Sequence, residues 1–261
     1  MSDSHPIGFF DSGVGLLSVL AETKKLLPRE IFVIFADQGH NPYGEKSAKQ
    51  IKSYATDATN FLIKKHNIKM MVLACNTATV LALGDLRKKF KIPIIGTVPA
   101  VKPAFKKSKG VKVAIMSTPL TAKSKYLTSL VSKFGNDKNA LKLGCRGLEE
   151  AIEILDHKKI DQILEKYLAK VKKFKPDVVI LGCTHYPLIK NKIQKELGNG
   201  VTLLDSGEAI AKRVRAILKE TKSFSSRRQS DIFYTTGDPK QFSRVASILL
   251  KKKINAFHAN I

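Results

Sequence analysis

Two stretches, Val72-Leu73-Ala74-Cys75-Asn76-Thr77 and Ile180-Leu181-Gly182-Cys183-Thr184-His185, share one pattern. In each, two aliphatic residues precede a small residue, a cysteine and polar residues typical of a helix start. A short apolar run that ends in a polar turn indicates a buried strand followed by a helix. We interpret the match as two equivalent strand ends in two similar domains; chance similarity of so short a pattern is the alternative.

The same alternation of apolar runs and helix-length segments extends along the whole chain. The clearest helix is expected at 159–174, where the apolar residues fall at helical spacing on one face. Other helices are expected at 15–27, 47–65, 77–90, 121–134, 187–197 and 207–222. Strands are expected at 7–10, 31–35, 70–74, 94–96, 111–116, 140–143, 178–181, 201–204 and 232–235. This alternation predicts an α/β fold of two similar doubly wound parallel-sheet domains, with the active site in the cleft between them.

Polar side chains gather just after the expected strands. In doubly wound folds, ligands bind beyond the carboxyl ends of the strands, so these positions are candidates for a site. They are Asp11-Ser12-Gly13, Asp37, Cys75-Asn76-Thr77, Thr118 and Cys183-Thr184-His185. The set is nucleophilic and capable of acid and base chemistry.

Two cysteines at matched strand ends suit the inversion of an amino acid at Cα. Inversion needs one group to remove a proton from one face and a second to return a proton to the other face. A thiol has an unperturbed pKa of about 8.5, and a helix N-terminus lowers it. We therefore expect Cys75 and Cys183 to be the two acid/base groups of a cofactor-independent racemase.

Each candidate residue also has a structural reading. A single cysteine is more often a buried small hydrophobe, and we assign Cys145 to that class. His185 could form a metal pair with Cys183, but no third ligand lies at suitable spacing, so we expect no metal site. His185 could also be a structural histidine, and Asp11 a turn or N-cap residue.

The composition limits the remaining functional classes. With 261 residues, 43% hydrophobic, the chain can form two packed domains, and we expect neither a signal peptide nor a membrane-spanning run. Three cysteines favour free thiols and a cytoplasmic protein. The net charge of +24 would suit an anionic partner, but the lysines are scattered and many end helices, as in Lys88-Lys89 and Lys172-Lys173. We therefore expect a basic solvated surface and no nucleic-acid partner.

No cofactor is expected either. Gly13-Val14-Gly15 follows a strand, but Ser18 stands where a dinucleotide fingerprint has its third glycine. A phosphate-binding P-loop is absent, and no motif singles out a lysine for a Schiff base.

Five blocks of the sequence resemble the aspartate/glutamate racemase family, and within it the glutamate branch. They occur in the family's order and spread over nearly the whole chain. The blocks are Phe10-Asp11-Ser12-Gly13-Val14-Gly15, Pro42-Tyr43-Gly44, Ala74-Cys75-Asn76-Thr77-Ala78, Gly182-Cys183-Thr184-His185-Tyr186-Pro187-Leu188 and Asp205-Ser206-Gly207.

The resemblance implies a role for individual residues. Cys75 would exchange the Cα proton of D-glutamate and Cys183 that of L-glutamate, assisted by Asp11 and His185. An auxiliary glutamate of the family would correspond to Glu153. The substrate pocket would be lined by Ser12, Pro42, Tyr43, Gly44, Asn76, Thr77, Thr118, Thr121 and Thr184.

The resemblance also implies an organisation and a role in the cell. The first domain would comprise 1–97 plus 208–261, with the second, 98–207, inserted into it. The family implies a homodimer that supplies D-glutamate for peptidoglycan. This chain departs from the family at Leu16, usually a glycine, at Arg146, usually a proline, and in the stretch 37–41.

Three other functions remain open. The first is racemisation of another acidic amino acid such as aspartate. The second is a basic nucleic-acid- or protein-binding factor that keeps the racemase fold. The third is a hydrolase that uses Cys183 and His185, which would explain only one of the two matched cysteines.

Overall fold

The computed structural model describes residues 4–107, 112–226 and 230–261, which form two compact α/β units. Unit 1 comprises Met1–Thr97 and Gly207–Ile261, and unit 2 comprises Val98–Ser206. Gly207, which the sequence analysis assigned to the inserted domain, lies in unit 1. The reason is that Gly207 begins helix α10, and α10 packs against α1 of unit 1.

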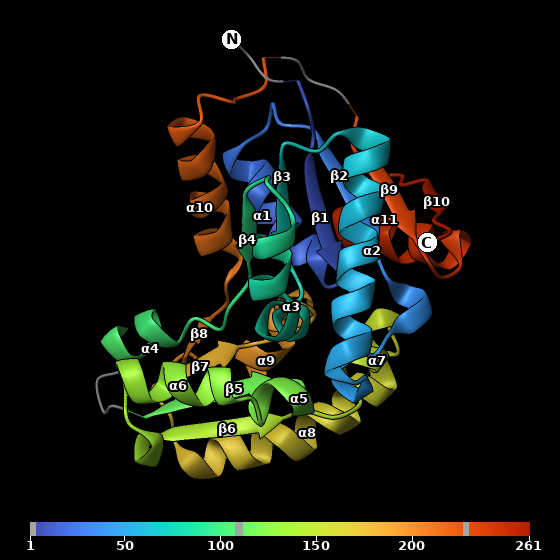
Figure 1. Cartoon of the computed structure of the whole chain (residues 1–261). Helices are drawn as coiled ribbons and strands as arrows, with labels where there is room; N and C mark the ends of the chain where they lie inside the picture. The colour runs from blue at the N-terminus through green and yellow to red at the C-terminus, as the bar shows by residue number, and fades with distance from the viewer. Residues whose placement is uncertain (1–3, 108–111, 227–229) are drawn as a thin grey trace. The chain divides into compact units, whose positions relative to one another are not determined.

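Unit 1 is built on a six-stranded sheet in the order β10-β9-β2-β1-β3-β4, with every neighbouring pair parallel. Figure 1 shows the carboxyl-terminal strands of this sheet, in red, beside the amino-terminal strands, in blue. The strands are β1 (Ile7–Asp11), β2 (Phe32–Ala36), β3 (Met70–Leu73), β4 (Ile94–Gly96), β9 (Ile232–Thr235) and β10 (Ala256–His258). The helices are α1 (Leu16–Leu26), α2 (Ala48–His66), α3 (Asn76–Lys89), α10 (Gly207–Glu220) and α11 (Pro239–Leu250), with short 3₁₀ turns η1 (Gln38–His40) and η2 (Tyr43–Glu45).

Unit 2 is built on a four-stranded parallel sheet in the order β6-β5-β7-β8. Its strands are β5 (Val113–Ser117), β6 (Ala140–Gly144), β7 (Val178–Leu181) and β8 (Thr202–Leu204). Its helices are α4 (Val101–Lys107), α5 (Pro119–Ala122), α6 (Lys125–Phe134), α7 (Leu148–Glu153), α8 (His157–Phe174) and α9 (Lys190–Leu197), with 3₁₀ turns η3 (Asp137–Asn139) and η4 (Tyr186–Ile189).

Helices cover both faces of the unit 2 sheet. Successive residues of a strand point to opposite faces, and β5 follows this rule. Ala114 and Met116 pack in a cluster with α7, α8 and α9, whereas Val113 and Ile115 pack with α4 and α6. A sheet buried on both faces needs strands that are apolar throughout, which explains the continuous hydrophobic runs of the sequence.

The expected elements differ from the structure in a few places. The helix expected at 121–134 is broken, because the Thr118 and Ser124 side chains each cap a new helix start, of α5 and α6. The segment expected to be helical from Pro187 begins as the 3₁₀ turn η4. Strand β10 and helices α4, α7 and α11 were not expected. Val111, the expected start of a strand, lies outside the described residues, and β5 begins at Val113.

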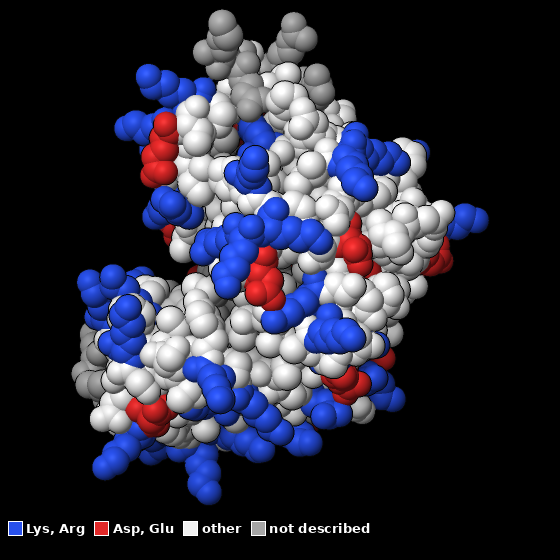
Figure 2. All heavy atoms as spheres, in the orientation of Figure 1, with Lys and Arg blue, Asp and Glu red and all other residues white. Residues whose placement is uncertain are grey.

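The described basic residues include those that the sequence places at helix ends. Lys88 and Lys89 lie in the last turn of α3, and Lys172 and Lys173 in that of α8, as expected. Figure 2 shows lysine and arginine spread over the face in view, with acidic residues between them. No helix in the described ranges is long and apolar enough to cross a membrane.

Gly144 tests how closely unit 2 is packed at the end of β6. A Cβ at Gly144 would lie 2.8 Å from the Cα of Pro119, a backbone atom that cannot turn aside. We expect Gly144→Ala to destabilise the protein by ~1–3 kcal/mol. The control is Gly84→Ala within α3, where nothing lies within 4 Å of the new Cβ. That change should stabilise by ~0.5–1 kcal/mol. Urea unfolding measures the free energy of unfolding of both variants. Equal values for the two variants would contradict the prediction.

Candidate active site

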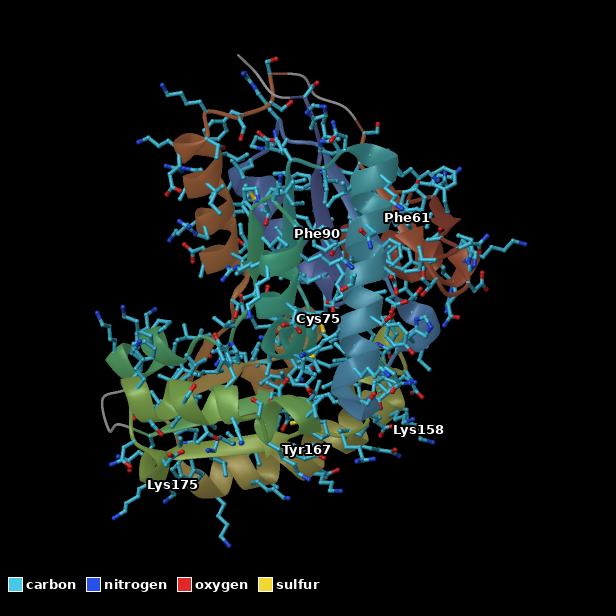
Figure 3. The ribbon with its side chains drawn as sticks, viewed as in Figure 1. Phe61, Cys75, Phe90, Lys158, Tyr167 and Lys175 are labelled. Atoms are coloured by element: carbon cyan, nitrogen blue, oxygen red, sulfur yellow. The ribbon has the colours of Figure 1, made fainter. Side chains whose placement is uncertain are left out.

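Cys75 lies where β3 passes into α3, at the N-cap of that helix (Figure 3). Its Sγ accepts a hydrogen bond from the Ala78 backbone N–H at 3.4 Å, and the residue is 5% exposed. Backbone N–H groups at a helix N-terminus favour negative charge, so this position stabilises a thiolate. The expected strand-to-helix setting of Cys75 is therefore present.

Ser12 links Cys75 to a buried carboxylate. Strand β1 pairs with β3, so the residues that follow the two strands lie side by side. Ser12 Oγ accepts a hydrogen bond from Cys75 Sγ at 3.9 Å and donates one to Asp11 Oδ1 at 3.3 Å. Asp11 also accepts the Ser12 backbone N–H at 2.7 Å and is fully buried. The result is a thiol–hydroxyl–carboxylate chain able to carry a proton away from Cys75.

Tyr43 lies beside this chain, in the Pro42-Tyr43-Gly44 segment. Its side chain is fully buried, and its Oη donates a hydrogen bond to Asp37 Oδ2 at 2.5 Å. Burial and the Asp37 carboxylate raise the pKa of Tyr43 well above its usual value, and the charges of Cys75 and Asp11 add to the rise. Tyr43 therefore remains a protonated donor at every physiological pH.

The other expected residues of unit 1 border the same thiol. Asn76 and Thr77 form the first turn of α3 and are buried, and Asn76 Nδ2 donates to the Thr97 carbonyl at 3.4 Å. Pro42 and Gly44 flank Tyr43 and are partly exposed. We refer to Asp11, Ser12, Tyr43, Cys75, Asn76 and Thr77 as the Cys75 half-site.

Cys183 follows β7 in unit 2, but its surroundings differ from those of Cys75. The chain continues into the short 3₁₀ turn η4, whose N-cap makes no side-chain cap hydrogen bond. Cys183 therefore precedes a short 3₁₀ turn and not the start of a long helix, although a backbone hydrogen bond from His185 still acts to lower its pKa. Burial raises the pKa of this thiol to about 11, although a hydrogen bond with the His185 side chain opposes the rise. The expected lowering of the Cys183 pKa is therefore outweighed by burial.

His185 bridges Cys183 and a carboxylate. Its Nδ1 lies 3.7 Å from Cys183 Sγ, and its Nε2 lies 2.5 Å from Glu153 Oε2, at the end of α7. Burial by itself lowers the pKa of His185, but its hydrogen bonds to Cys183 and Glu153 raise it well above the usual value. The raised pKa favours the protonated form of the ring, and the Glu153 carboxylate lies next to it. Despite Arg146, the structure brings Glu153 to this site.

Three threonines complete the expected set in unit 2. Thr118 follows β5 and caps α5, and its Oγ1 lies 3.1 Å from that of Thr121. Thr184 lies between Cys183 and His185, and all three threonines are buried. We refer to Thr118, Thr121, Glu153, Cys183, Thr184 and His185 as the Cys183 half-site.

Sequence reasoning assigned no role to two residues beside the Cys183 half-site. Glu149 lies one helical turn before Glu153 on α7 and is buried, and its charge adds to the raised pKa of Cys183. The spacing of four residues between Glu149 and Glu153 could have indicated that both lie on one face of a helix. Tyr186 donates from Oη to the carbonyls of Ser117 and Cys145 at 3.3 and 3.4 Å, which ties the Cys183 loop to the ends of β5 and β6. Cys145 is itself buried, and desolvation raises its pKa to about 12, so it stays a thiol.

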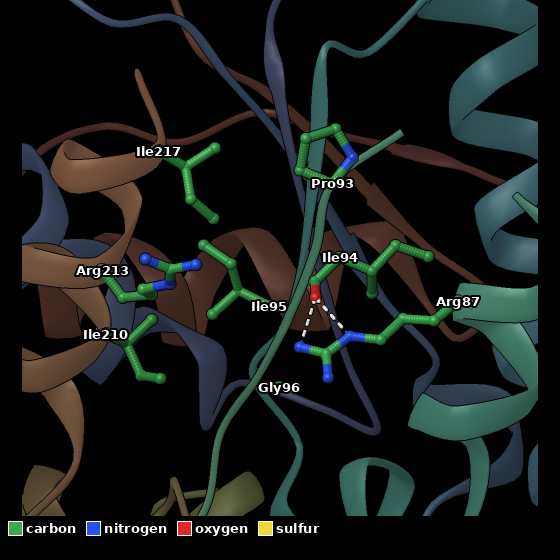
Figure 4. Close-up of a pocket in the computed structure, with 8 residues that line it drawn as sticks. All are labelled: Arg87, Pro93, Ile94, Ile95, Gly96, Ile210, Arg213 and Ile217. Atoms are coloured by element: carbon green, nitrogen blue, oxygen red, sulfur yellow. Dashed lines mark hydrogen bonds between the residues drawn. The ribbon is translucent and has the colours of Figure 1, made fainter. Parts of the chain in front are cut away.

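A separate pocket of about 530 Å³ in unit 1 holds none of these residues (Figure 4). It is lined by arginines and aliphatic residues of α3, β4 and α10, and Arg87 donates two hydrogen bonds to the Ile94 carbonyl, at 3.0 and 2.8 Å.

Within the described ranges, no three His, Cys, Asp or Glu side chains are grouped to hold a metal ion.

The raised pKa of Cys183 has a direct chemical consequence. In a Cys75→Ser/Cys145→Ser variant, we expect the rate of Cys183 alkylation by iodoacetamide to rise about tenfold per pH unit from pH 7 to about 10. Only the thiolate reacts, and a pKa of about 11 leaves its fraction below saturation over this whole range. A plateau below pH 9 would instead indicate a thiolate stabilised by the His185 imidazolium.

The chain is similar in sequence and structure to known racemases. Residues 18–214 match the family model described as Asp/Glu/Hydantoin racemase. A glutamate racemase of Clostridium novyi is 42% identical over 223 residues, covering 84% of this chain and 86% of that protein.

Solved structures extend the similarity to the complete chain. A glutamate racemase isoform of Bacillus anthracis superposes with a TM-score of 0.88 at 30% identity, covering 98% of both chains. The Escherichia coli glutamate racemase, solved with L-glutamate and the activator UDP-MurNAc-Ala, gives a TM-score of 0.85 at 30% identity, covering 97% of both chains. The chain belongs to the Asp/Glu/hydantoin racemase family.

Proposed function

We propose that this chain interconverts L-glutamate and D-glutamate without a cofactor, using Cys75 and Cys183 as the two acid/base groups. The observation that carries the proposal is that each strand-end thiol has its own proton-handling partners. Cys75 is linked through Ser12 to Asp11, and Cys183 contacts His185, which contacts Glu153. Relatives named glutamate racemase support the choice of substrate.

The proposed reaction moves one proton on each side of Cα. With D-glutamate bound, the Cys75 thiolate removes the Cα proton, and the Cys183 thiol donates its proton to the opposite face. The products are L-glutamate, a Cys75 thiol and a Cys183 thiolate, and the reverse reaction exchanges the two roles. Each group acts as an acid in one direction and a base in the other, as a reversible inversion requires.

The two half-sites differ in a way that suits the D-to-L direction. The helix N-terminus favours a thiolate at Cys75, and burial keeps Cys183 protonated. Once Cys183 has given up its proton, the adjacent His185 imidazolium stabilises the thiolate that forms. Before the next turnover, we propose that Cys75 passes its proton through Ser12 to Asp11 and that Cys183 takes a proton from His185, with solvent restoring both partners.

Glutamate carries two carboxylates and one ammonium group. Its site therefore needs hydrogen-bond donors for each carboxylate. Both half-sites have hydroxyl or amide groups near the thiols, and we propose that residues of both take part in binding glutamate. The proposed binding residues are Ser12, Pro42, Tyr43, Gly44, Asn76, Thr77, Thr118, Thr121 and Thr184. The Escherichia coli relative was solved with L-glutamate, which supports this choice of ligand.

In the cell, we propose that the enzyme supplies D-glutamate for peptidoglycan as a cytoplasmic homodimer. The three cysteines are free, which suits a reducing compartment. Growth of a D-glutamate-requiring bacterium without added D-glutamate, after expression of this chain, would test the role. Light scattering would test the dimer.

A cysteine hydrolase is the second candidate, because Cys183, His185 and Glu153 have the order of a nucleophile, a base and an orienting acid. This function would leave the Cys75–Ser12–Asp11 chain unused. Ester turnover that is lost in Cys183→Ala, from a protein that does not racemise glutamate, would favour it.

Proton exchange at Cα tests the leading proposal directly. Purified protein, with no added cofactor, is incubated with D-glutamate in D₂O, while circular dichroism follows inversion and NMR follows deuterium at Cα. We expect wild-type protein to do both. Cys75→Ser and Cys183→Ser should each lose racemisation by about 10²–10⁴-fold, because each removes one acid/base group.

The control for these variants is Cys145→Ser, which should keep near-wild-type activity because the hydrogen bond found for this thiol goes to the Leu143 carbonyl and not to the proposed proton chains. D-Aspartate is tested alongside. Faster turnover of aspartate would keep the mechanism and reject the substrate. A folded protein that acts on neither amino acid would reject the racemase proposal.

A further inference from the structure

A buried carboxylate behind the Cys75 half-site accepts hydrogen bonds from three side chains. Asp37 follows β2 and is fully buried. Its Oδ2 accepts from Tyr43 Oη at 2.5 Å, and its Oδ1 accepts from Thr236 Oγ1 at 2.7 Å and His40 Nδ1 at 2.8 Å. Burying a carboxylate costs free energy unless hydrogen-bond donors replace the lost water. The position of Asp37 therefore depends on the three donors, and Asp37 in turn holds them in place.

Thr236 reaches Asp37 from the distant carboxyl-terminal part of unit 1. Strand β9 pairs with β2 in register, which places the residues after the two strands side by side. The Thr236 hydroxyl donates to Asp37 and also accepts the Gly39 N–H at 2.9 Å. A Cβ at Gly39 would lie 2.9 Å from the Thr236 carbonyl oxygen, so only glycine permits this approach of the two loops.

His40 closes the cluster on the other side. Its ring stacks on that of Tyr54 of α2, with centroids 3.8 Å apart, and Tyr54 in turn lies beside Tyr43 with centroids 6.0 Å apart. Tyr43 also contacts Phe10 of β1, at 6.2 Å between centroids. The Tyr43 ring is thus held from both sides, while Asp37 fixes its hydroxyl.

We propose that Asp37, held by Thr236 and His40, is a positioning residue that keeps the Pro42-Tyr43-Gly44 segment in place next to Cys75. The segment after β9 would then support the substrate site without touching the substrate. This inference rests on the proposed function, in which 42–44 helps to bind glutamate. It assigns no proton transfer to Asp37, Thr236 or His40.

The effect of loosening this support should fall on binding. Without the Thr236 hydroxyl, Asp37 Oδ1 loses one of its two donors, and the Gly39 N–H loses its acceptor. The 42–44 segment would then sample other positions. Cys75, Ser12 and Asp11 keep their own hydrogen bonds, so the chemical step is spared.

Steady-state kinetics with D-glutamate separate these effects. Thr236→Val should raise KM about tenfold, equivalent to ~1.4 kcal/mol of binding, and change kcat less than twofold. Thr236→Ser keeps the hydroxyl and should restore KM. Thr221→Val is the matched control, because the Thr221 hydroxyl bonds only the Ile217 carbonyl and Ser223 among the contacts found, in the turn after α10. Its KM should be unchanged.

A double-mutant cycle tests whether Thr236 acts through Tyr43. In a Tyr43→Phe background, which lacks the hydroxyl that Asp37 holds, Thr236→Val should raise KM by less than threefold further. An unchanged KM in Thr236→Val, no rescue by serine, or full additivity with Tyr43→Phe would each overturn the proposal.

His40 offers a second pair of variants if Thr236→Val does not fold. His40→Phe keeps a ring to stack on Tyr54 but loses the donor to Asp37, whereas His40→Gln keeps a donor and loses the ring. We expect His40→Phe to raise the KM for D-glutamate more than His40→Gln does. The opposite order would show that stacking, and not Asp37, positions the segment.

An activity-independent measurement separates failure of this inference from failure of the proposed function. Hydrogen exchange of the peptide spanning 40–47 should be about tenfold faster in Thr236→Val than in wild type and unchanged in Thr221→Val. If wild-type protein does not racemise glutamate, the proposed function fails, and this result still decides whether Thr236 and Asp37 hold the segment. Equal exchange in all three proteins would refute the positioning role.

Discussion

Parallel pairing of neighbouring strands is the constraint on which both half-sites depend. Because β1 pairs with β3, the turn that carries Asp11 and Ser12 lies against the turn that carries Cys75. The pairing of β5 with β7 has the same effect in unit 2, where the Gly182 N–H bonds the Met116 carbonyl. Parallel strands expose their carboxyl ends at one edge of the sheet, so polar residues far apart in sequence converge there.

The two thiols occupy similar positions in the fold and different electrostatic environments. Cys75 receives a backbone N–H at the start of a long helix, which favours a thiolate. Cys183 is as deeply buried as Cys75, but it precedes only a 3₁₀ turn and has the His185–Glu153 pair beside it. A symmetrical reaction therefore does not need symmetrical groups. In the proposed reaction, each thiol would reach acid/base competence by a different combination of burial, hydrogen bonding and charge.

Much of the architecture could be predicted from local patterns. The strands at Val178–Leu181 and Ile232–Thr235 were expected with their observed bounds. Short runs of β-branched and aromatic residues favour the strand conformation. Strand β10 was missed, because Ala256–His258 is short and two of its residues are exposed. Helix α7 was missed as well, because six residues are too few to show a helical period.

The sequence by itself determined which residues follow the strands. An apolar run and the polar residues that end it are neighbours in the chain, so both can be recognised without the tertiary structure. It therefore identified Cys75, Cys183, Asp11 and His185 as candidates. Only the tertiary structure decided their environment. Burial opposes ionisation of Cys183, and it depends on side chains from α7, β5 and β6 that no local pattern brings together. The bond from Thr236 to Asp37 likewise spans almost 200 residues, because strand order, and not chain order, sets the neighbours.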